Sequence, residues 1–172
     1  MDALEAIHTR RSIRKYTEKP ISSEVIKEIL SAAMSAPSAV NAQTWTFIVI
    51  DDRKILDEVP NFSPYAGMCR GAPLAILVCG DTTQEKAAGF WVQDCSAATQ
   101  NLLLATHALG LGAVWTGIYP MPDRISGFRK AFELPEHIIP LGLVVIGYPA
   151  QKPEPQNRYK EEKVYHNKYG QK

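Results

Sequence analysis

Apolar residues in the first part of the chain repeat at the spacing of a helix. Ser22 stands where an N-cap residue would, and the apolar positions after it recur at intervals of three and four residues until Pro37. A shorter helix is predicted after Asp2, because Glu5 follows it at the spacing of a capping box. The same periodicity predicts three further helices, at about residues 54–59, 85–109 and 122–132.

The segment 85–109 is the longest of these, and its apolar residues cover more than one face of a helix. Such a helix has to be buried on most sides, either by its own sheet or by another subunit. Gly110 is a natural C′ residue, because glycine accepts the left-handed conformation that ends many helices. His107 is interpreted as a hydrogen-bonded core residue rather than a catalyst.

Short apolar runs, several of them rich in β-branched residues, predict four strands, at residues 46–50, 74–78, 113–116 and 141–146. Helices and strands therefore alternate, which is typical of the α/β and α+β classes, and a doubly wound sheet is the default topology. The 172 residues suit a single domain. From residue 149 the chain is polar, and Pro153 and Pro155 favour an extended tail that is either loose or laid over a partner.

Composition and charge exclude several classes of protein. Hydrophobic residues make up 45% of the chain and its formal net charge is +1, so a core can form and a general nucleic-acid binder is not expected. The sequence starts without a signal-peptide pattern and contains no apolar run of the ~18 residues that a membrane helix needs. Cys69, Cys79 and Cys95 form no Cys-x-x-Cys pair, which favours buried thiols in a reducing cytoplasm over a disulfide or metal site.

A basic cluster near the N-terminus is the first candidate site. In an extended segment alternate residues point to the same side, which would bring Arg10, Ser12 and Arg14 together. Two guanidinium groups that flank a hydroxyl suit a phosphate group, because arginine donates paired hydrogen bonds. The charges alone are equally typical of a solvated basic patch.

The polar loop at residues 37–45 is the second candidate. Asn41 and Gln43 each offer an acceptor and two donors, the mixture needed to bind the edge of a heterocycle that carries both N–H and C=O groups. Taken alone, the pattern is more typical of an ordinary loop that enters a strand.

The glycine-rich segment 110–118 is the third candidate, because glycine at a strand end allows a flat ligand to approach the backbone and a backbone N–H to bind a ring nitrogen. A helix C-cap, a buried strand and a turn explain the same residues. The sequence offers no recognisable catalytic triad, Gly-x-Gly-x-x-Gly fingerprint or P-loop. Binding features without a side-chain catalyst favour a protein whose cofactor carries the chemistry.

Taken in order, these motifs resemble the nitroreductase family. Residues 10–14 resemble its Arg-Arg-Ser-x-Arg motif, and residues 37–45 resemble its Pro-Ser-x-x-Asn-x-Gln-Pro-Trp loop. Residues 110–117 resemble its Gly-Leu-Gly-x-x-Trp-x-Gly segment, residues 143–149 its last strand, and Arg158 its basic residue shortly before the C-terminus. The resemblance spans essentially the whole chain.

The resemblance implies an α+β fold of the nitroreductase type, in which helices flank a mainly antiparallel sheet. It also implies a domain-intertwined homodimer, with a C-terminal tail of about residues 150–172 that wraps on the partner subunit. FMN would lie in two clefts at the subunit interface, and NADH or NADPH would be the electron donor. The candidate FMN contacts that it implies are Arg10, Arg11, Ser12, Arg14, Pro37, Ser38, Asn41, Gln43, Tyr65, Thr116, Gly117, Ile118 and Arg158.

The family implies a role for each group of these residues. Arg10, Ser12 and Arg158 would hold the FMN phosphate, and Arg14 would lie near the pyrimidine edge of the ring. The backbone of residues 116–118 would face the N5 side of the ring, whereas the loop residues would come from the partner subunit.

Two positions depart from the family pattern. Thr44 replaces the usual proline before Trp45, and the loop 61–72 has Tyr65 where some members offer a lysine to the ring. Arg70 in the same loop is a candidate substitute for that lysine.

The function implied by the resemblance is NAD(P)H-driven two-electron reduction of nitroaromatics, quinones or similar small molecules by a ping-pong mechanism. The chemistry would lie at N5 of FMN, so no side chain is expected to act as the catalyst, and no metal is expected. One alternative is a specialised reaction of the same fold, such as dehalogenation, flavin fragmentation or azoline oxidation. The others are non-enzymatic flavin binding or delivery, and a basic arm that binds nucleic acid. Neither nucleic acid nor a membrane is the expected partner.

Overall fold

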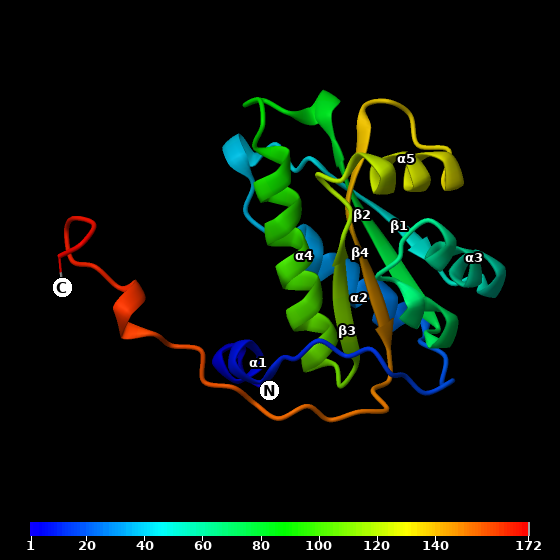
Figure 1. Ribbon diagram of the computed structural model, residues 1–172, viewed down its shortest axis with the longest axis horizontal. Helices are drawn as coiled ribbons and strands as arrows, with labels where there is room; N and C mark the ends of the chain where they lie inside the picture. Colours follow the sequence, from blue (N-terminus) through cyan, green and yellow to red (C-terminus); the bar gives the residue numbers. More distant parts are fainter. Residues whose placement is uncertain (172) are drawn as a thin grey trace.

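The computed structural model describes residues 1–171 and shows a four-stranded sheet with helices on both faces (Figure 1). Every pair of neighbouring strands is antiparallel, as the family resemblance implied. The strands are β1 (Trp45–Ile50), β2 (Leu74–Asp81), β3 (Gly112–Gly117) and β4 (Ile138–Gly147). Their order along the sheet is β1-β2-β4-β3, so β1 and β3 are the edge strands.

The default expectation of a doubly wound parallel sheet is wrong. β2 and β3 both pair antiparallel with β4, so they run in the same direction and are joined by helix α4 (Trp91–Ala108), as in a βαβ unit. β4 lies between them and runs the opposite way. Helices and strands alternate along the sequence whether such a unit is split or continuous, so the pattern alone could not distinguish the two topologies.

The first two helices begin where the sequence predicts. The Asp2 carboxylate accepts a hydrogen bond from the backbone N–H of Glu5 at 2.9 Å, and the Ser22 hydroxyl accepts one from that of Val25 at 3.4 Å. The helices besides α4 are α1 (Ala3–Thr9), α2 (Ser23–Met34), α3 (Arg53–Glu58) and α5 (Pro122–Ala131).

Helix α4 begins at Trp91, and the predicted start near Glu85 is wrong. Glu85 lies before the helix, where its carboxylate accepts hydrogen bonds from the backbone N–H groups of Gly89 at 2.8 Å and Trp91 at 3.1 Å. It thus satisfies an N–H group that has no partner inside the helix. Gly89 has a φ of 88°, which is incompatible with a continuous right-handed helix. The other end is as expected, because Gly110 has a φ of 78°.

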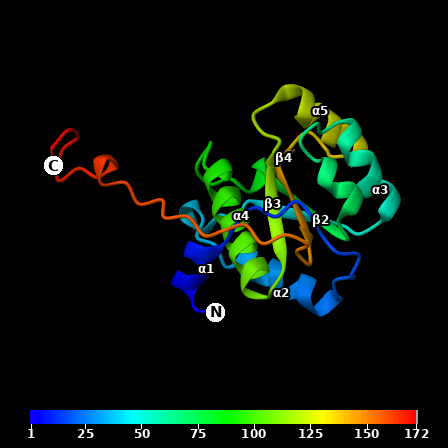
Figure 2. The same ribbon diagram turned by 60° about the horizontal axis from the view of Figure 1, so that its bottom comes forward.

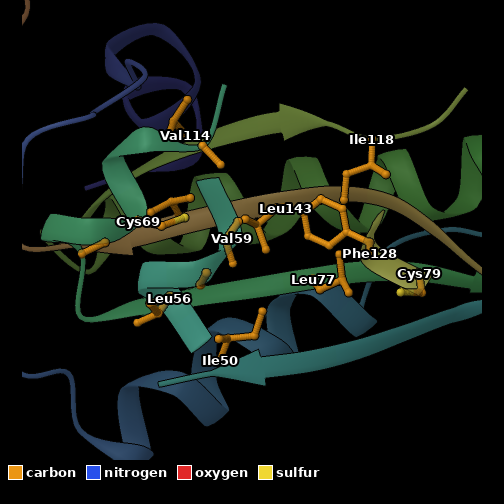
Figure 3. Packing of buried hydrophobic residues seen from close by; sticks show 14 of the residues in the cluster. Ile50, Leu56, Val59, Cys69, Leu77, Cys79, Val114, Ile118, Phe128 and Leu143 are labelled. Carbon is orange, nitrogen blue, oxygen red and sulfur yellow. The ribbon is translucent and has the colours of Figure 1, made fainter. Parts of the chain in front are cut away.

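Helices α3 and α5 cover one face of the sheet. Leu56 of α3 and Phe128 of α5 belong to the same buried cluster as Leu77 and Leu143 of the two central strands, and Figure 3 shows Phe128 beside Leu77 and Leu143. The loop 59–72 contributes buried side chains to the same cluster. The burial of all these side chains fixes the position of the loop that carries Tyr65.

Helices α2 and α4 cover the opposite face. Ile29 of α2 and Leu102 of α4 are fully buried with Ile76 and Val144, and α4 lies along the whole length of the sheet (Figures 1 and 2). Leu104 and Ala105, on another side of α4, stay partly exposed. The helix therefore buries one side within its own subunit and keeps a second apolar side available.

The cysteines agree with the interpretation as small buried residues. All three are free and buried, and burial raises the pKa of each thiol to about 12. The thiols are therefore protonated near neutral pH. Across residues 1–171, the helices are too short or too polar to cross a lipid bilayer.

The tail leaves the domain after β4. It passes beside α1 and then extends away from the body of the molecule (Figures 1 and 2). Its start is fixed by a hydrogen bond from the backbone N–H of Ala150 to the carbonyl of Lys15 at 2.9 Å, whereas residues 152–171 are exposed. The tail is extended around Pro153 and Pro155, as predicted, but a short 3-10 helix at Glu161–Lys163 and a turn closed by the hydrogen bond from the His166 N–H to the Gln171 carbonyl at 2.9 Å follow. Residue 172 lies outside the described residues.

We predict that Gly80→Ala destabilises the protein by about 1–3 kcal/mol, the usual cost of forcing an extra carbon into a packed core. The indole ring of Trp91 lies over Gly80, and an added Cβ would overlap a ring carbon. Urea unfolding should show a lower midpoint with an unchanged slope. Gly67→Ala is the control, because nothing lies within 4 Å of a Cβ there. Equal midpoints for the two variants would contradict this packing.

Candidate functional site

The basic segment near the N-terminus lies along the start of β3. The backbone N–H of Ile13 donates to the carbonyl of Ala113 at 2.9 Å, and that of Thr17 donates to the carbonyl of Tyr148 at 2.9 Å. The Ile13 side chain comes within 2.7 Å of the place where a Cβ on Gly112 would stand. Gly112 therefore admits a segment of its own chain, where the sequence suggested the approach of a flat ligand.

Arg10, Arg11 and Arg158 form a group that we call the arginine cluster. All three line one surface cleft between the end of α1 and the tail. Burial lowers the pKa of the Arg10 guanidinium, and the positive charges of Arg158 and Arg11 lower it further. Arg11 is held by the tail, since its Nε donates to the carbonyl of Glu154 at 3.1 Å and its Nη2 to that of Gln156 at 3.3 Å.

The arginine cluster is not neutralised by a carboxylate of the described chain. The ion pair found among residues 1–171 joins Arg53 and Asp57, which lie on α3. Like charges that are held together in a partly buried cleft repel each other and attract anions. Paired guanidinium donors suit the oxygens of a phosphate, so the cluster fits the phosphate group that the sequence predicted here.

The structure divides the predicted group of Arg10, Ser12 and Arg14. Ser12 pairs with Ala113 in an isolated bridge and stays next to the arginine cluster. Arg14 is exposed, and its charge partly offsets the rise that burial causes in the pKa of the Tyr16 hydroxyl. It is not among the charges that act on Arg10. Arg158, which is distant in the sequence, lies beside Arg10, where the alternation of side chains in an extended segment had predicted Arg14.

The polar loop has a strained backbone. Val40, Asn41 and Gln43 each have a φ of 52°, a conformation that residues other than glycine rarely adopt. The Gln43 side-chain amide donates to the side-chain oxygen Oδ1 of Asn41 at 2.9 Å, and the Gln43 backbone N–H donates to the Ser38 hydroxyl at 3.0 Å. These bonds hold two of the predicted ring-binding side chains together at the surface, with Pro37 at the start of the loop.

Asp94 of α4 is the buried partner of this loop. Its carboxylate is 4% exposed and accepts hydrogen bonds from the backbone N–H of Ala39 at 2.8 Å and from the Thr44 hydroxyl at 3.2 Å. Sequence reasoning missed this residue because it placed Asp94 within a long helix described by its apolar positions. An acidic residue in the first turn of a helix was the signal that could have identified it.

The end of β3 offers one free backbone donor. The N–H of Ile118 donates to the carbonyl of Leu141 at 3.1 Å, and the Thr116 hydroxyl donates to that of Leu143 at 3.2 Å. Because successive residues of a strand point their N–H groups to opposite sides, the N–H of Gly117 faces the free edge of the sheet. No other strand of the sheet pairs with this edge of β3, and a Cβ on Gly117 would have nothing within 4 Å on the face of the sheet beside it.

Tyr65 is brought to the same end of β3 by Arg124. The Arg124 guanidinium lies 4.8 Å from the centre of the Tyr65 ring, and its Nη1 donates to the carbonyl of Gly117 at 2.8 Å. Arg124 is on α5 and carries no sequence signal of this role. Arg70, the other candidate of the loop, lines a separate cleft with Glu18 and Asp51.

Comparison with known proteins identifies the family. The model of the nitroreductase family matches residues 7–66 and 62–148. A candidate NADH dehydrogenase/NAD(P)H nitroreductase of Methanothermobacter thermautotrophicus is 51% identical over 98% of this chain and 88% of its own. The chain belongs to the nitroreductase family. Sequence analysis had reached the same family from the four motifs and Arg158.

Solved nitroreductase structures have the same fold. A candidate NADH dehydrogenase/NAD(P)H nitroreductase from Bacteroides thetaiotaomicron superposes with a TM-score of 0.93 at 46% identity, over 97% of this chain and 98% of its own. A candidate nitroreductase from Desulfovibrio desulfuricans, solved in complex with FMN, gives 0.84 at 33% identity over 98% and 99%.

The candidate site of this nitroreductase is divided between the two ends of α4. Asp94, in the first turn of the helix, holds the polar loop. His107, in the last turn, lies 2.8 Å from the Thr9 hydroxyl, next to the arginine cluster. At 1.5 Å per residue the two turns are roughly 20 Å apart. Within one subunit the polar loop therefore lies far from the arginine cluster.

His107 is hydrogen-bonded as expected, but it is partly exposed and lies outside the core. The Thr9 hydroxyl donates to the carbonyl of Glu5 at 2.6 Å, so it can only accept a hydrogen bond from Nε2 of His107. Burial lowers the pKa of His107, and the positive charges of Arg10 and Arg11 lower it further.

We predict that His107 makes the protein less stable in acid. As the pH falls through the usual histidine range near 6.5, the unfolded chain binds a proton before the folded protein does, so stability decreases. The free energy of unfolding should therefore fall more between about pH 7.5 and pH 5.5 in the wild type than in His107→Gln. His166→Gln in the exposed tail should behave as the wild type. Identical pH profiles for all three proteins would refute the effect.

Proposed function

We propose that this nitroreductase is a homodimer that binds FMN at each subunit interface, accepts hydride from NADH or NADPH and reduces small acceptors such as nitroaromatics or quinones. The observation that carries the proposal is the unneutralised arginine cluster beside β3, in a chain whose family and relatives act with flavin and nicotinamide cofactors. The free N–H of Gly117 and the paired amides of Asn41 and Gln43 also support it.

The division of the site supports a dimer. If a two-fold axis places two α4 helices side by side and antiparallel, the Asp94 end of one helix lies beside the His107 end of the other. The polar loop of one subunit is then brought to the cleft that begins at the arginine cluster of its partner. The partly exposed apolar side of α4, with Leu104 and Ala105, supplies a surface for this contact. The tail from about residue 150 would wrap on the partner.

The free edge of β3 matches the shape of FMN. From the Ser12–Ala113 bridge to Gly117 the strand extends about 13 Å. We propose that Arg10, Ser12 and Arg158 hold the phosphate at one end of this edge. The ribityl chain would follow the strand, and the N–H of Gly117 would donate to N5 of the ring at the other end.

The other candidate residues would surround the ring. Asn41 and Gln43 of the partner's loop would bind the polar edge of the ring with their paired amides, and Tyr65 would border it beside Gly117. Arg14 would lie at the pyrimidine edge, where its positive charge would offset the negative charge that reduction adds. When bound, FMN accepts a hydride and passes two electrons to an acceptor. The side chains of this subunit would orient the ring, and we propose that one face of it stays open.

The open face gives the proposed reaction its order. Because one face would receive the nicotinamide and then the acceptor, the first product has to leave before the second substrate binds. The result is a ping-pong mechanism in which the site discriminates only weakly between acceptors of different size. The free buried thiols fit a reducing compartment, and we propose the cytoplasm.

We predict that the purified protein is yellow and loses its visible flavin absorbance when NADH or NADPH is added without oxygen. A quinone should restore the absorbance, and initial rates at varied concentrations of both substrates should give parallel double-reciprocal lines. Colourless protein that takes up no FMN would contradict the cofactor. Bound FMN that neither nicotinamide reduces would instead indicate flavin storage or delivery, and intersecting lines would contradict the shared face.

We predict that Arg158→Ala weakens FMN binding roughly 10- to 100-fold, because hydrogen bonds to a charged group contribute about 1.5–3 kcal/mol. Riboflavin lacks the phosphate, so its affinity should not change. Fluorescence titration of both flavins measures the two affinities. Lys130→Ala removes one positive charge from α5 and should bind both flavins as the wild type does. Equal losses for FMN and riboflavin would show that Arg158 does not hold the phosphate.

A further inference from the structure

The packing of side chains in the polar loop does not explain its strained backbone. Val40 is β-branched, has a φ of 52° and is 67% exposed, so burial of its side chain does not stabilise this conformation. Asn41 and Gln43 have the same φ. Residues other than glycine are strained in this region, and such strain persists only where surrounding contacts impose it.

Asp94 imposes it from both sides. Its two carboxylate oxygens bind Ala39, directly before the strained residues, and Thr44, directly after them. The carboxylate is buried in the first turn of α4, where the helix dipole favours a negative charge. Hydrogen bonds to a carboxylate are stronger than bonds between neutral groups. The distance between the two ends of the loop is therefore fixed by one side chain.

We propose that Asp94 and Thr44 are positioning residues, which hold the loop in the shape that presents Asn41 and Gln43 to the flavin ring of the partner subunit. We call this pair of contacts the loop clip. The clip touches neither the flavin nor the substrate, and acts only through the loop. The inference rests on the proposed flavin site.

Thr44 gives this chain its own version of the clip. The family's usual residue before Trp45 is proline, which has no side-chain donor. Here the Thr44 hydroxyl is buried and donates to the Asp94 carboxylate, so the loop has a second bond to α4 that proline could not make. We infer that loop geometry in this chain depends on a hydrogen bond that can be removed without changing side-chain volume.

The test is the affinity of the full-length protein for FMN and for riboflavin. Thr44→Val should lower the affinity for FMN and for riboflavin by the same factor, about tenfold, because the loop contacts the ring that the two flavins share. Thr44→Ser keeps the hydroxyl and should restore most of the affinity. Asp94→Asn keeps an acceptor for Ala39 but loses the charge, and should give a smaller loss than Asp94→Ala.

Thr99→Val is the matched control. Thr99 is a second buried threonine whose hydroxyl donates at 2.7 Å, but to the carbonyl of Cys95 within α4. This variant loses the same group from the same core, and should bind both flavins normally even if its unfolding midpoint falls. Circular dichroism confirms that each variant is folded under the conditions of the titration, so that a loss of affinity is not a loss of fold.

The outcomes separate the clip from the proposed site. Wild-type protein that binds neither flavin would overturn the site itself. If the wild type binds both flavins and Arg158→Ala loses affinity for FMN alone, the proposed flavin site is supported. Unchanged affinities for both flavins in Thr44→Val would then overturn the proposed role of the loop clip. A loss for FMN alone in Thr44→Val, or an equal loss in Thr99→Val, would overturn it as well.

Discussion

The packing of α4 across the sheet is the constraint on which the rest of this structure depends. The helix joins β2 to β3 and buries Cys95 and Leu102 against the central strands. Because an α-helix is rigid over this length, it fixes the distance between its two ends. Asp94 holds the polar loop at one end, and His107 meets the segment of the arginine cluster at the other. The same helix thus stabilises the core and keeps the two halves of the candidate site apart within one subunit.

This arrangement explains why a dimer is needed for the proposed activity. A single subunit presents an anion site and the free edge of β3, but its own polar loop lies roughly 20 Å from the arginine cluster along α4. Two antiparallel copies of α4 would restore the missing half on each side. The second apolar side of the helix, which the sequence already indicated, would supply the contact.

The elements of the fold could be predicted from the sequence, but their pairing could not. Caps such as Asp2 and Ser22 and the stop at Gly110 act on neighbouring residues, so local patterns identify them. The position of β4 between β2 and β3 depends on side chains that meet only after folding, and alternation in the sequence carries no record of it. The predicted start of α4 was wrong for a related reason. Glu85 caps the helix from outside, and a glutamate in that position looks the same in the sequence as one inside the helix.

The site shows the same division between local and long-range information. Arg10 and Arg11 are neighbours in the sequence, and their motif was sufficient to suggest an anion site. Arg158 was identified by family resemblance alone, and Arg124 and Asp94 were not identified at all, since each acts on a segment distant in the chain. Three-dimensional contacts were needed to show that the Ile13 side chain packs on Gly112, whereas no side chain packs on Gly117.

The arginine cluster also links anion binding to the tail. Arg11 binds the carbonyls of Glu154 and Gln156, and Arg158 lies only a short distance farther along the same tail. Without an anion, the repulsion between Arg158 and Arg10 opposes the contact that Arg11 makes with the tail. A bound phosphate would turn that repulsion into attraction by all three guanidinium groups. In the proposed dimer, where the tail wraps on the partner, FMN would therefore strengthen subunit association, and by thermodynamic linkage association would strengthen FMN binding by the same factor.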